Sequence, residues 1–442
     1  MSKKVFILGS GLSGLAAAVY LIKNKFPVTV LEKRPFSGGR TFSFQKEFWP
    51  FPIDNGPHVM LGCYTELLDL LKVVHAKSLL AVQNRLTVPF YRNPDSSVNL
   101  QAANLPAPFH LLHGLLRFSL LNWQQKTKII LAIFPLVRAR ENRRMDQFSA
   151  GDWFRRTGQD EAAVRVFWQP LILATLNAAP AQVSFLQLFR VLKIGFLAGG
   201  KNSRMIFIPE GLTRTLIEPL KIWIEKNGGK IKLQETVRKI IVRENSVREI
   251  ITGKSKYDGF DTVVCALPFH SLSVLLDASQ WRQNSLFKSV QTFHANVIMN
   301  FHFWYRGRLT DEKFLAIPGR VSQWLFMQKE NDGFIHHTIV VSGANDLLSK
   351  SKKEMVEIVF AELTGLFPGF RAGSVQKYYI TVEKNATLAV YPGIEKKRPG
   401  AKTSIANLFL AGDWTATGLP ATMESAVKSG RLAAESVLEI LT

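Results

Sequence analysis

Short apolar runs of strand length lie near the N-terminus, past the middle and near the C-terminus of the chain. Residues 5–8 and 28–31 are two such runs, and residues 261–268 and 407–413 contain two more. Continuous apolar runs of this length are typical of parallel strands that are buried on both faces. A helical stretch over residues 15–25 separates the first two runs, and a proline ends it. The pattern therefore predicts an α/β fold that begins with a strand, a helix and a second strand.

Two long stretches between these runs follow other patterns. Residues 63–199 space their Leu and Phe residues as helices do. Apolar and polar residues alternate over 297–303 and 335–341, which predicts strands with one buried face. We therefore expect two insertions in the α/β part, one of helices and one with a mixed or antiparallel sheet.

The first turn of the predicted strand–helix–strand unit carries the pattern GxGxxG. Gly9 allows a tight turn, Gly11 lets the backbone approach a pyrophosphate, and Gly14 lets the helix pack closely on the strand. The N-terminus of the helix would face a diphosphate with free N–H groups and the positive end of its dipole. Glu32 ends the second strand, where a carboxylate accepts hydrogen bonds from ribose hydroxyls. Because all these parts fall in register, the segment predicts a dinucleotide site rather than a glycine-rich loop without ligand.

A second glycine motif distinguishes a flavin from a nicotinamide dinucleotide. Gly38 and Gly39 precede Arg40 and Thr41, soon after the predicted ribose-binding acid. The two motifs together resemble the double signature of the superfamily of FAD-dependent amine oxidases and phytoene desaturases. The resemblance implies a Rossmann-like domain that binds FAD, in which an arginine at the position of Arg40 supports the diphosphate. Residues 54–58 resemble the segment that runs beside the isoalloxazine in that superfamily.

Segments far downstream extend this resemblance. The backbone at the position of Val237 contacts the adenine in the superfamily, and the positions of Gly412 and Asp413 approach the ribityl chain. Pro420 is expected to start a helix as its first residue, and this helix points its N-terminus at the N1–C2=O edge of the flavin. The resemblance thus implies the cofactor-binding residues Gly9, Ser10, Gly11, Leu12, Ser13, Gly14, Glu32, Lys33, Gly39, Arg40, Thr41, Asn55, Gly56, Pro57, His58, Val237, Gly412, Asp413, Pro420, Ala421, Thr422 and Met423. No Cys or His stands at a recognisable flavin-linking position, so we expect the FAD to be non-covalent.

The chain of 442 residues predicts two or three domains at about 100–200 residues each. We expect a discontinuous FAD-binding domain made of residues 1–62, 200–270 and 385–442. Residues 63–199 would form the helical insertion, and residues 271–384 a substrate domain that contains a sheet.

A further set of residues narrows the resemblance to one family. Residues 167–180 read FWQPLILATLNAAP and resemble the signature of the squalene-associated FAD-dependent desaturases, which are also called hydroxysqualene dehydroxylases. Residues 55–64, 209–212 and 412–424 are similar to that family as well, and the match runs in order along essentially the whole chain. Pro57 departs from the pattern, because the family often has glutamine there. The resemblance implies reduction of hydroxysqualene to squalene in bacterial squalene and hopanoid synthesis, with an electron donor for FAD that the sequence does not identify.

The chemistry of such a reaction sets requirements on the protein. The substrate hydroxyl is allylic, so its loss as water leaves an allyl cation that a hydride from reduced flavin can quench. The protein must then provide a long apolar tunnel and a proton for the leaving hydroxyl. Phe outnumbers Tyr by 31 to 8, which suits such a tunnel, although each Phe taken alone could be a core residue. His58 is the first candidate for the proton donor and Glu424 the second, unless Glu424 caps its helix; water entering with the substrate is a third possibility.

Other functions remain open. A carotenoid-type desaturase has the same fold but removes hydride and proton from a polyene, with oxidised FAD and an acceptor. An amine oxidase would need an aromatic pair before the flavin, for which Tyr391 and Trp414 are the candidates. A non-catalytic flavoprotein is a further alternative, against which the complete set of flavin-contact positions argues.

The net charge and the number of cysteines indicate the partners and the compartment of the protein. Fifty-six Lys and Arg against 34 Asp and Glu give a net charge of +22, which attracts polyanions. Since no zinc finger, RRM-type motif or helix-turn-helix spacing is visible, we expect an anionic membrane as the partner and no nucleic acid. An ordinary solvated basic surface is the alternative. The two cysteines cannot form a disulfide framework and no metal-ligand cluster is visible, so we expect a reducing compartment and no metal.

One segment combines many basic residues with few acids. Residues 110–145 combine apolar clusters with one acid, Glu141, and seven basic residues, namely Arg117, Lys126, Lys128, Arg138, Arg140, Arg143 and Arg144. This composition fits a basic amphipathic helix pair on a membrane surface, or equally a helical cap whose apolar face is core. The longest uncharged stretch, residues 166–189, is broken by prolines and amides and is not a span. No signal peptide is expected, and we predict a cytoplasmic protein that associates peripherally with the inner face of the membrane.

Overall fold

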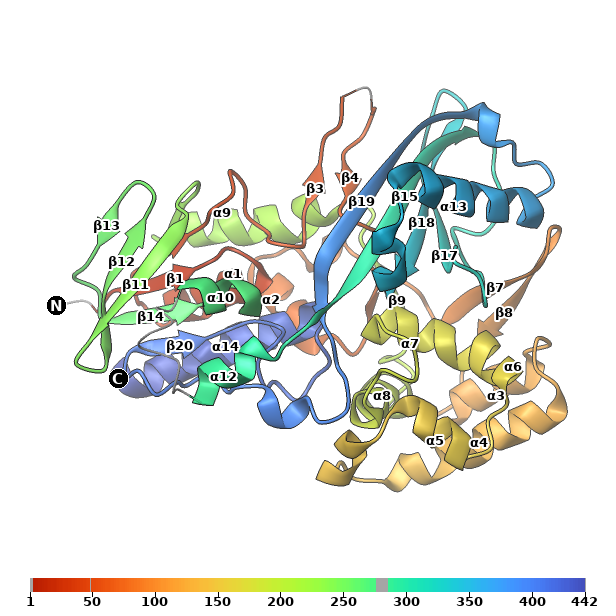
Figure 1. Cartoon of the computed structure of the whole chain (residues 1–442), viewed down its shortest axis with the longest axis horizontal. Coiled ribbons are helices and arrows are strands. Elements are labelled where there is room, and N and C mark those ends of the chain that lie inside the picture. The colour runs from red at the N-terminus through yellow and green to blue at the C-terminus, as the bar shows by residue number, and fades with distance from the viewer. Residues whose placement is uncertain (1–2, 48, 276–284, 442) are drawn as a thin grey trace.

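Five short parallel strands from three distant parts of the chain form one sheet (Figure 1). Its order is β10 (Lys230–Lys232), β2 (Val28–Leu31), β1 (Val5–Leu8), β14 (Thr262–Cys265) and β20 (Leu408–Leu410). The apolar side chains of the central strands are buried, and α1 (Leu12–Lys23) packs against α14 (Met423–Leu441) beside them. The computed structural model describes residues 3–47, 49–275 and 285–441. The predicted α/β fold with a parallel sheet is confirmed.

A second, larger sheet forms the upper part of the other lobe (Figure 1). Its order is β19 (Val375–Leu388), β15 (Ala295–Arg306), β18 (Phe334–Ser342), β17 (Trp324–Asn331), β16 (Phe314–Ala316), β7 (Thr87–Asn93) and β8 (Ser96–Gln101). Both stretches with alternating side chains lie in it, in β15 and β18, as predicted. The apolar side of α13 (Lys352–Leu366) packs on these strands through Val359 and Leu363.

Helices form the lower part of the same lobe (Figure 1). They are α3 (Phe109–Arg117), α4 (Trp123–Arg138), α5 (Ala150–Arg156), α6 (Glu161–Ala163), α7 (Gln169–Leu176) and α8 (Phe185–Arg190). One part of the predicted helical insertion is not helical, because β7 and β8 form an antiparallel hairpin. The hairpin joins the larger sheet where Phe90 pairs with Ala316 of β16.

The remaining elements connect the two lobes or cover the first sheet. They are β3 (Ser43–Phe44), β4 (Ile53–Asp54), β5 (Met60–Leu61), α2 (Thr65–Val73), β6 (Ala81–Val82), β9 (Met205–Phe207), α9 (Glu218–Lys226), β11 (Val237–Arg243), β12 (Ser246–Thr252), β13 (Lys256–Tyr257), α10 (Phe269–Leu275) and α12 (Ser285–Gln291). Within the described ranges, no helix combines the length and the hydropathy that crossing a bilayer requires.

Candidate functional site

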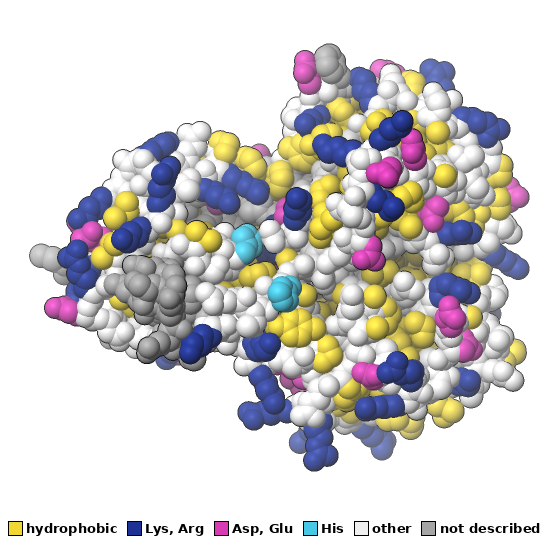
Figure 2. Space-filling model, in the orientation of Figure 1, with side chains coloured by type: hydrophobic (Ala, Val, Ile, Leu, Met, Phe, Trp, Pro, Cys, Tyr) yellow, Lys and Arg dark blue, Asp and Glu magenta, His cyan; other side chains and the backbone are white. Residues whose placement is uncertain are grey.

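A cavity of about 1310 Å³ extends from the first glycine motif to the helices of the other lobe. Gly9, Gly11 and Gly39 line one end of it, and Phe109 and Phe134 line the other. Ordinary ligand pockets have about 300–1,000 Å³, so this cavity has room for more than one small molecule. The hollow between the lobes is visible on the face drawn in Figure 2, where Lys and Arg side chains clearly outnumber acidic ones.

The glycine end of the cavity is shaped to hold a diphosphate. Gly11 is the N-cap of α1 with φ −69° and ψ 175°, no side chain caps this helix, and its first turn contains no acid. The first N–H groups of a helix have no partner within it, so this end offers donors to an anion. A Cβ built on Gly11 would meet no atom within 4 Å, which shows that the space beside its backbone is open. The residues present therefore fit the dinucleotide that the motif predicted.

Two of the predicted cofactor-binding residues lie behind the cavity wall rather than in it. Ser10 and Gly14 are not among the residues that line the cavity. Ser10 donates from its backbone N–H and its hydroxyl to Oε2 of Glu32, at 2.9 and 2.8 Å. Gly14 faces the turn, since a Cβ on it would lie 2.0 Å from the carbonyl oxygen of Gly9. In the structure Ser10 orients the predicted ribose-binding carboxylate, and Gly14 lets α1 approach the strand, so both shape the site from behind its lining; their contact with a cofactor stays a prediction.

Arg40 bonds to two distant parts of the protein. Its Nη2 donates to Oδ1 of Asp413 at 2.6 Å, and its Nη1 donates to the carbonyl of Ala386 at 2.6 Å. All three residues line the cavity. The guanidinium therefore joins the glycine motif to β19 and to the segment after β20. Its support of a diphosphate, which the resemblance implied, stays a prediction.

The start of α14 forms another wall of the cavity. The helix begins at Met423, so the prediction that Pro420 is its first residue is wrong. Thr422 caps the helix, because its Oγ1 accepts the N–H of Ser425 at 3.4 Å. Pro420, Ala421, Thr422 and Met423 all line the cavity, as do the remaining predicted cofactor residues, namely Gly9, Gly11, Leu12, Ser13, Glu32, Lys33, Gly39, Arg40, Thr41, Asn55, Gly56, Pro57, His58, Val237, Gly412 and Asp413.

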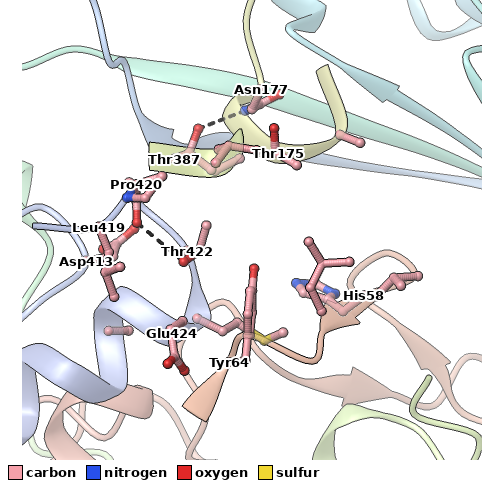
Figure 3. Close-up of a pocket in the computed structure, with 18 of the residues that line it drawn as sticks. His58, Tyr64, Thr175, Asn177, Thr387, Asp413, Leu419, Pro420, Thr422 and Glu424 are labelled. Atoms are coloured by element: carbon pink, nitrogen blue, oxygen red, sulfur yellow. Dashed lines mark hydrogen bonds between the residues drawn. The ribbon is translucent and has the colours of Figure 1, made fainter. Parts of the chain in front are cut away.

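The two candidate proton donors both line the cavity but have different environments (Figure 3). Nδ1 of His58 lies 2.8 Å from the carbonyl oxygen of Gly56, which can only accept, so Nδ1 carries the hydrogen. Burial lowers the pKa of His58, which keeps the ring neutral near pH 7. The carboxylate of Glu424 accepts the N–H groups of Glu66 and Leu67 at 2.8 and 2.9 Å. It therefore caps α2 rather than its own helix, and burial raises its pKa to about 7.

Three polar residues of the cavity wall were missed at the sequence level (Figure 3). Tyr64 follows the turn after β5, and burial raises the pKa of its hydroxyl. Asn177 ends α7 with φ 52°, and its Nδ2 donates to Oγ1 of Thr387 at 2.9 Å. Asn177 stands inside the family signature, so a signal for it was available. Nothing local marks Thr387, because its partner lies 210 positions away.

The part of the cavity toward α3 and α4 is mostly apolar, with Arg138 of α4 also in its lining. Its lining includes Leu86, Val88, Phe90, Leu100, Leu111, Leu112, Leu115, Ile130, Ile133, Phe167 and Leu171. The aromatic pair that an amine oxidase would need is not formed by the two candidates. Trp414 is buried and donates its indole N–H to the carbonyl of Leu267, whereas Tyr391 is not among the lining residues and donates to the carbonyl of Thr292.

Comparisons with known proteins agree with this geometry. The family model described as flavin containing amine oxidoreductase matches residues 12–438. A hydroxysqualene dehydroxylase from Sinorhizobium fredii is 28% identical over 452 residues, covering 99% of each chain. A 15-cis-phytoene desaturase from Synechococcus elongatus is 25% identical, covering 98% of this chain and 96% of its own. The crystal structure of an oxidoreductase from Methanosarcina mazei has the same fold, with a TM-score of 0.76 at 21% identity over 99% of this chain and 100% of that one.

Proposed function

Because the chain belongs to the family of flavin containing amine oxidoreductases, we propose that it binds FAD non-covalently and reduces hydroxysqualene to squalene. One observation carries the proposal beyond the family: the dinucleotide cradle opens into a long apolar tunnel within the same cavity. A C30 isoprenoid fits apolar walls of this extent, whereas a small amine would leave them unfilled. The similarity to hydroxysqualene dehydroxylases over the whole chain supports the same substrate.

The residues of the cradle would hold the cofactor. The backbone at Gly11 and the N-terminus of α1 would bind the diphosphate, and Glu32 would accept hydrogen bonds from the ribose. Val237 lines the cavity where the family resemblance expects the adenine. The Arg40–Asp413 pair would fix the segment along the ribityl chain, and the N-terminus of α14 would favour negative charge on the flavin edge. Reduced FAD, when bound, supplies the hydride.

The protein then has to control the loss of the hydroxyl group. The C–O bond of the substrate would break, its oxygen would take one proton and leave as water, and the carbon would accept the hydride, a two-electron equivalent that bound, reduced FAD would supply. We assign the source of this proton to Glu424, acting through water across the cavity: it lines the cavity, and its pKa of about 7 leaves part of the carboxyl groups protonated at neutral pH. His58 is neutral and its N–H is bonded to Gly56. The apolar walls keep other water away from the cationic carbon.

The test is a single turnover without oxygen. Protein that has been reduced chemically and freed of excess reductant should convert hydroxysqualene to squalene, in an amount equal to its FAD. With flavin N5 deuterated in deuterated buffer, deuterium should appear at the carbon that lost oxygen. Oxidised protein is the control and should give no squalene. Desaturation of phytoene by oxidised protein, with no reaction of hydroxysqualene, would assign the chain to the desaturases instead.

We also propose that the substrate enters from an anionic membrane on which α3 and α4 lie. Phe109 of α3 and Phe134 of α4 are 57% and 73% exposed, and both line the cavity. Trp123 and Leu131 of α4 are 67% and 66% exposed. Residues three or four positions apart lie on the same face of a helix, so Trp123, Thr127, Leu131 and Phe134 form one stripe along α4. Apolar side chains at the mouth of a lipid tunnel suit insertion between acyl chains.

Exposed basic residues lie on the same two helices and in the segment that follows them. Six of the seven predicted basic residues are exposed, namely Arg117, Lys128, Arg138, Arg140, Arg143 and Arg144. Lys126 is not available, because it is buried and its Nζ donates to the carbonyl of Leu116 at 2.7 Å. Each basic residue near an anionic surface contributes about 1 kcal/mol.

Binding to vesicles tests the membrane proposal. The protein should bind vesicles of anionic lipid more tightly than neutral ones, and the difference should shrink as salt rises. Lys128→Glu with Arg138→Glu should weaken binding to anionic vesicles by about tenfold or more, since two attractive charges become repulsive. Lys254→Glu, at an exposed position of the other lobe, is the matched control and should have little effect. Equal binding to both lipids would contradict the electrostatic part of the proposal.

A further inference from the structure

A pair of polar side chains interrupts the apolar wall of the cavity at the end of α7. Asn177 is 4% exposed, and its amide has a fixed orientation. Its Oδ1 accepts the backbone N–H of Gly343 at 2.6 Å, and its Nδ2 donates to Oγ1 of Thr387 at 2.9 Å. Because the backbone N–H can only donate, the amide oxygen must face Gly343 and the amide nitrogen must face Thr387.

This orientation determines what Thr387 can offer to a ligand. A hydroxyl has one hydrogen to donate and two lone pairs. Oγ1 of Thr387 accepts from Asn177, so its own hydrogen can be directed to a further acceptor. Both residues line the cavity. Thr175 lines the same wall, but its hydroxyl already donates to the carbonyl of Leu171 at 2.7 Å. Of these two threonines, Thr387 is therefore the one whose hydroxyl hydrogen remains available to a ligand.

The position of the pair relative to the cofactor residues is visible in Figure 3. Asn177 and Thr387 lie across the cavity from Tyr64 and Glu424, with Pro420 beside them. The neighbouring lining residues are Leu171, Leu173, Ala174 and Leu419. A substrate that is hydrocarbon except for one polar group can place that group against the hydroxyl of Thr387 while its chain lies along these apolar neighbours.

We propose that Thr387, oriented by Asn177, is a binding site for the hydroxyl group of an isoprenoid alcohol. Its O–H donates to the substrate oxygen, which holds the C–O bond in the reaction region and stabilises negative charge on that oxygen as the bond breaks. A site that hydrogen-bonds a hydroxyl discriminates against an analogue without it, since its own polar group is then left unpaired. The pair therefore selects the alcohol over the hydrocarbon. This inference rests on the proposed function for its substrate.

Binding to the oxidised holoenzyme tests the site without turnover. The dissociation constants of hydroxysqualene and of squalene would be measured from the change in flavin absorbance. Wild-type protein should prefer the alcohol, and Thr387→Val, which has the same shape without the hydroxyl, should weaken alcohol binding about tenfold while leaving squalene binding unchanged. Thr387→Ser should retain the preference, and Thr175→Val, the matched control, should bind both ligands as wild type does.

The same variants separate this inference from the proposed function. In the anaerobic single turnover, Thr387→Val should slow squalene formation about 100-fold and Thr387→Ser much less. An unchanged flavin spectrum and unfolding temperature would show that Thr387→Val is folded and loaded. If wild-type protein prefers the alcohol and Thr387→Val loses that preference, the hydroxyl-binding site is supported. If no squalene forms in the same experiments, the proposed reaction is wrong but the binding site still stands. Equal binding of alcohol and hydrocarbon by wild-type protein, or an unaltered preference in Thr387→Val, overturns the site.

Discussion

Gly11→Val should give a folded protein that is colourless. The backbone at Gly11 has φ −69° and ψ 175°, a conformation that any residue adopts, so the substitution should cause no strain in the chain. The Cβ would meet no protein atom within 4 Å, because it points into the open cradle of the cavity. A valine side chain there would take the space of the diphosphate, and FAD affinity should fall on the order of a thousandfold or more.

Absorbance in the visible range and circular dichroism would measure the two parts of this prediction. Gly365→Val is the matched control, since a Cβ on Gly365 also meets nothing within 4 Å but lies in α13, away from the cavity; it should stay yellow. Gly14→Val should instead unfold the domain, because its Cβ would lie 2.0 Å from the carbonyl oxygen of Gly9. Acid precipitation of wild-type protein should release all its colour. A yellow Gly11→Val protein would refute the cradle.

The first sheet could be predicted because its strands are local features. Four of its five strands are short apolar runs, and Val5–Leu8 with Val28–Leu31 lies in one continuous unit that carries the glycine motif; the edge strand β10 reads Lys-Ile-Lys. The hairpin of β7 and β8 was missed because its place in the larger sheet depends on one contact, between Phe90 and Ala316, far apart in the chain. The Pro94-Asp95 turn between two short runs was the available signal.

In the site, too, local features could be predicted from the sequence and long-range contacts could not. Backbone positions such as Gly11 follow from the motif, because the motif describes a turn. The partners of side chains do not: Arg40 and Asp413 are 373 positions apart, and Asn177 and Thr387 are 210 apart. The role of Glu424 also depended on such a partner, since it caps α2 rather than its own helix. Hydrogen-bond partners of this kind are brought together by the fold, and no motif or regular spacing in the sequence indicates them.

One further long-range group supports the wall of the cavity that leads to α14. The side chain of Arg398 is 0% exposed. It donates to the carbonyls of Asp413, Trp414 and Leu419, at 2.9, 3.4 and 2.7 Å. It also pairs with Glu395 at 3.4 Å, and Glu395 pairs with Arg190 of α8 at 2.8 Å. A single guanidinium thus holds the loop that carries Asp413 and Pro420, and connects that loop to the helical part of the other lobe.

Arg398→Met should lower the free energy of unfolding by about 3–5 kcal/mol, because it removes one partner of a buried ionic group and leaves buried carbonyls unpaired. FAD binding should weaken as well, since the loop from Gly412 to Pro420 lines the cavity. Urea unfolding of the protein without FAD, and titration of FAD, would measure the two effects separately. Lys396→Met, at the exposed neighbouring position, is the matched control and should change neither.

A second substitution shows whether the stability lost in Arg398→Met comes from the unpaired carbonyls or from the broken ion pair with Glu395. Adding Glu395→Gln to Arg398→Met removes the carboxylate that has lost a partner, but it leaves the three carbonyls unpaired. If the carbonyls dominate, the double variant should be no more stable than Arg398→Met. Recovery of most of the stability in the double variant would instead place the loss in the charge of Glu395, which keeps only Arg190 as its cationic partner once Arg398 is removed. A loss below about 1 kcal/mol for Arg398→Met, with unchanged FAD affinity, would show that the loop keeps its shape without this residue, since ordinary surface substitutions have effects of that size.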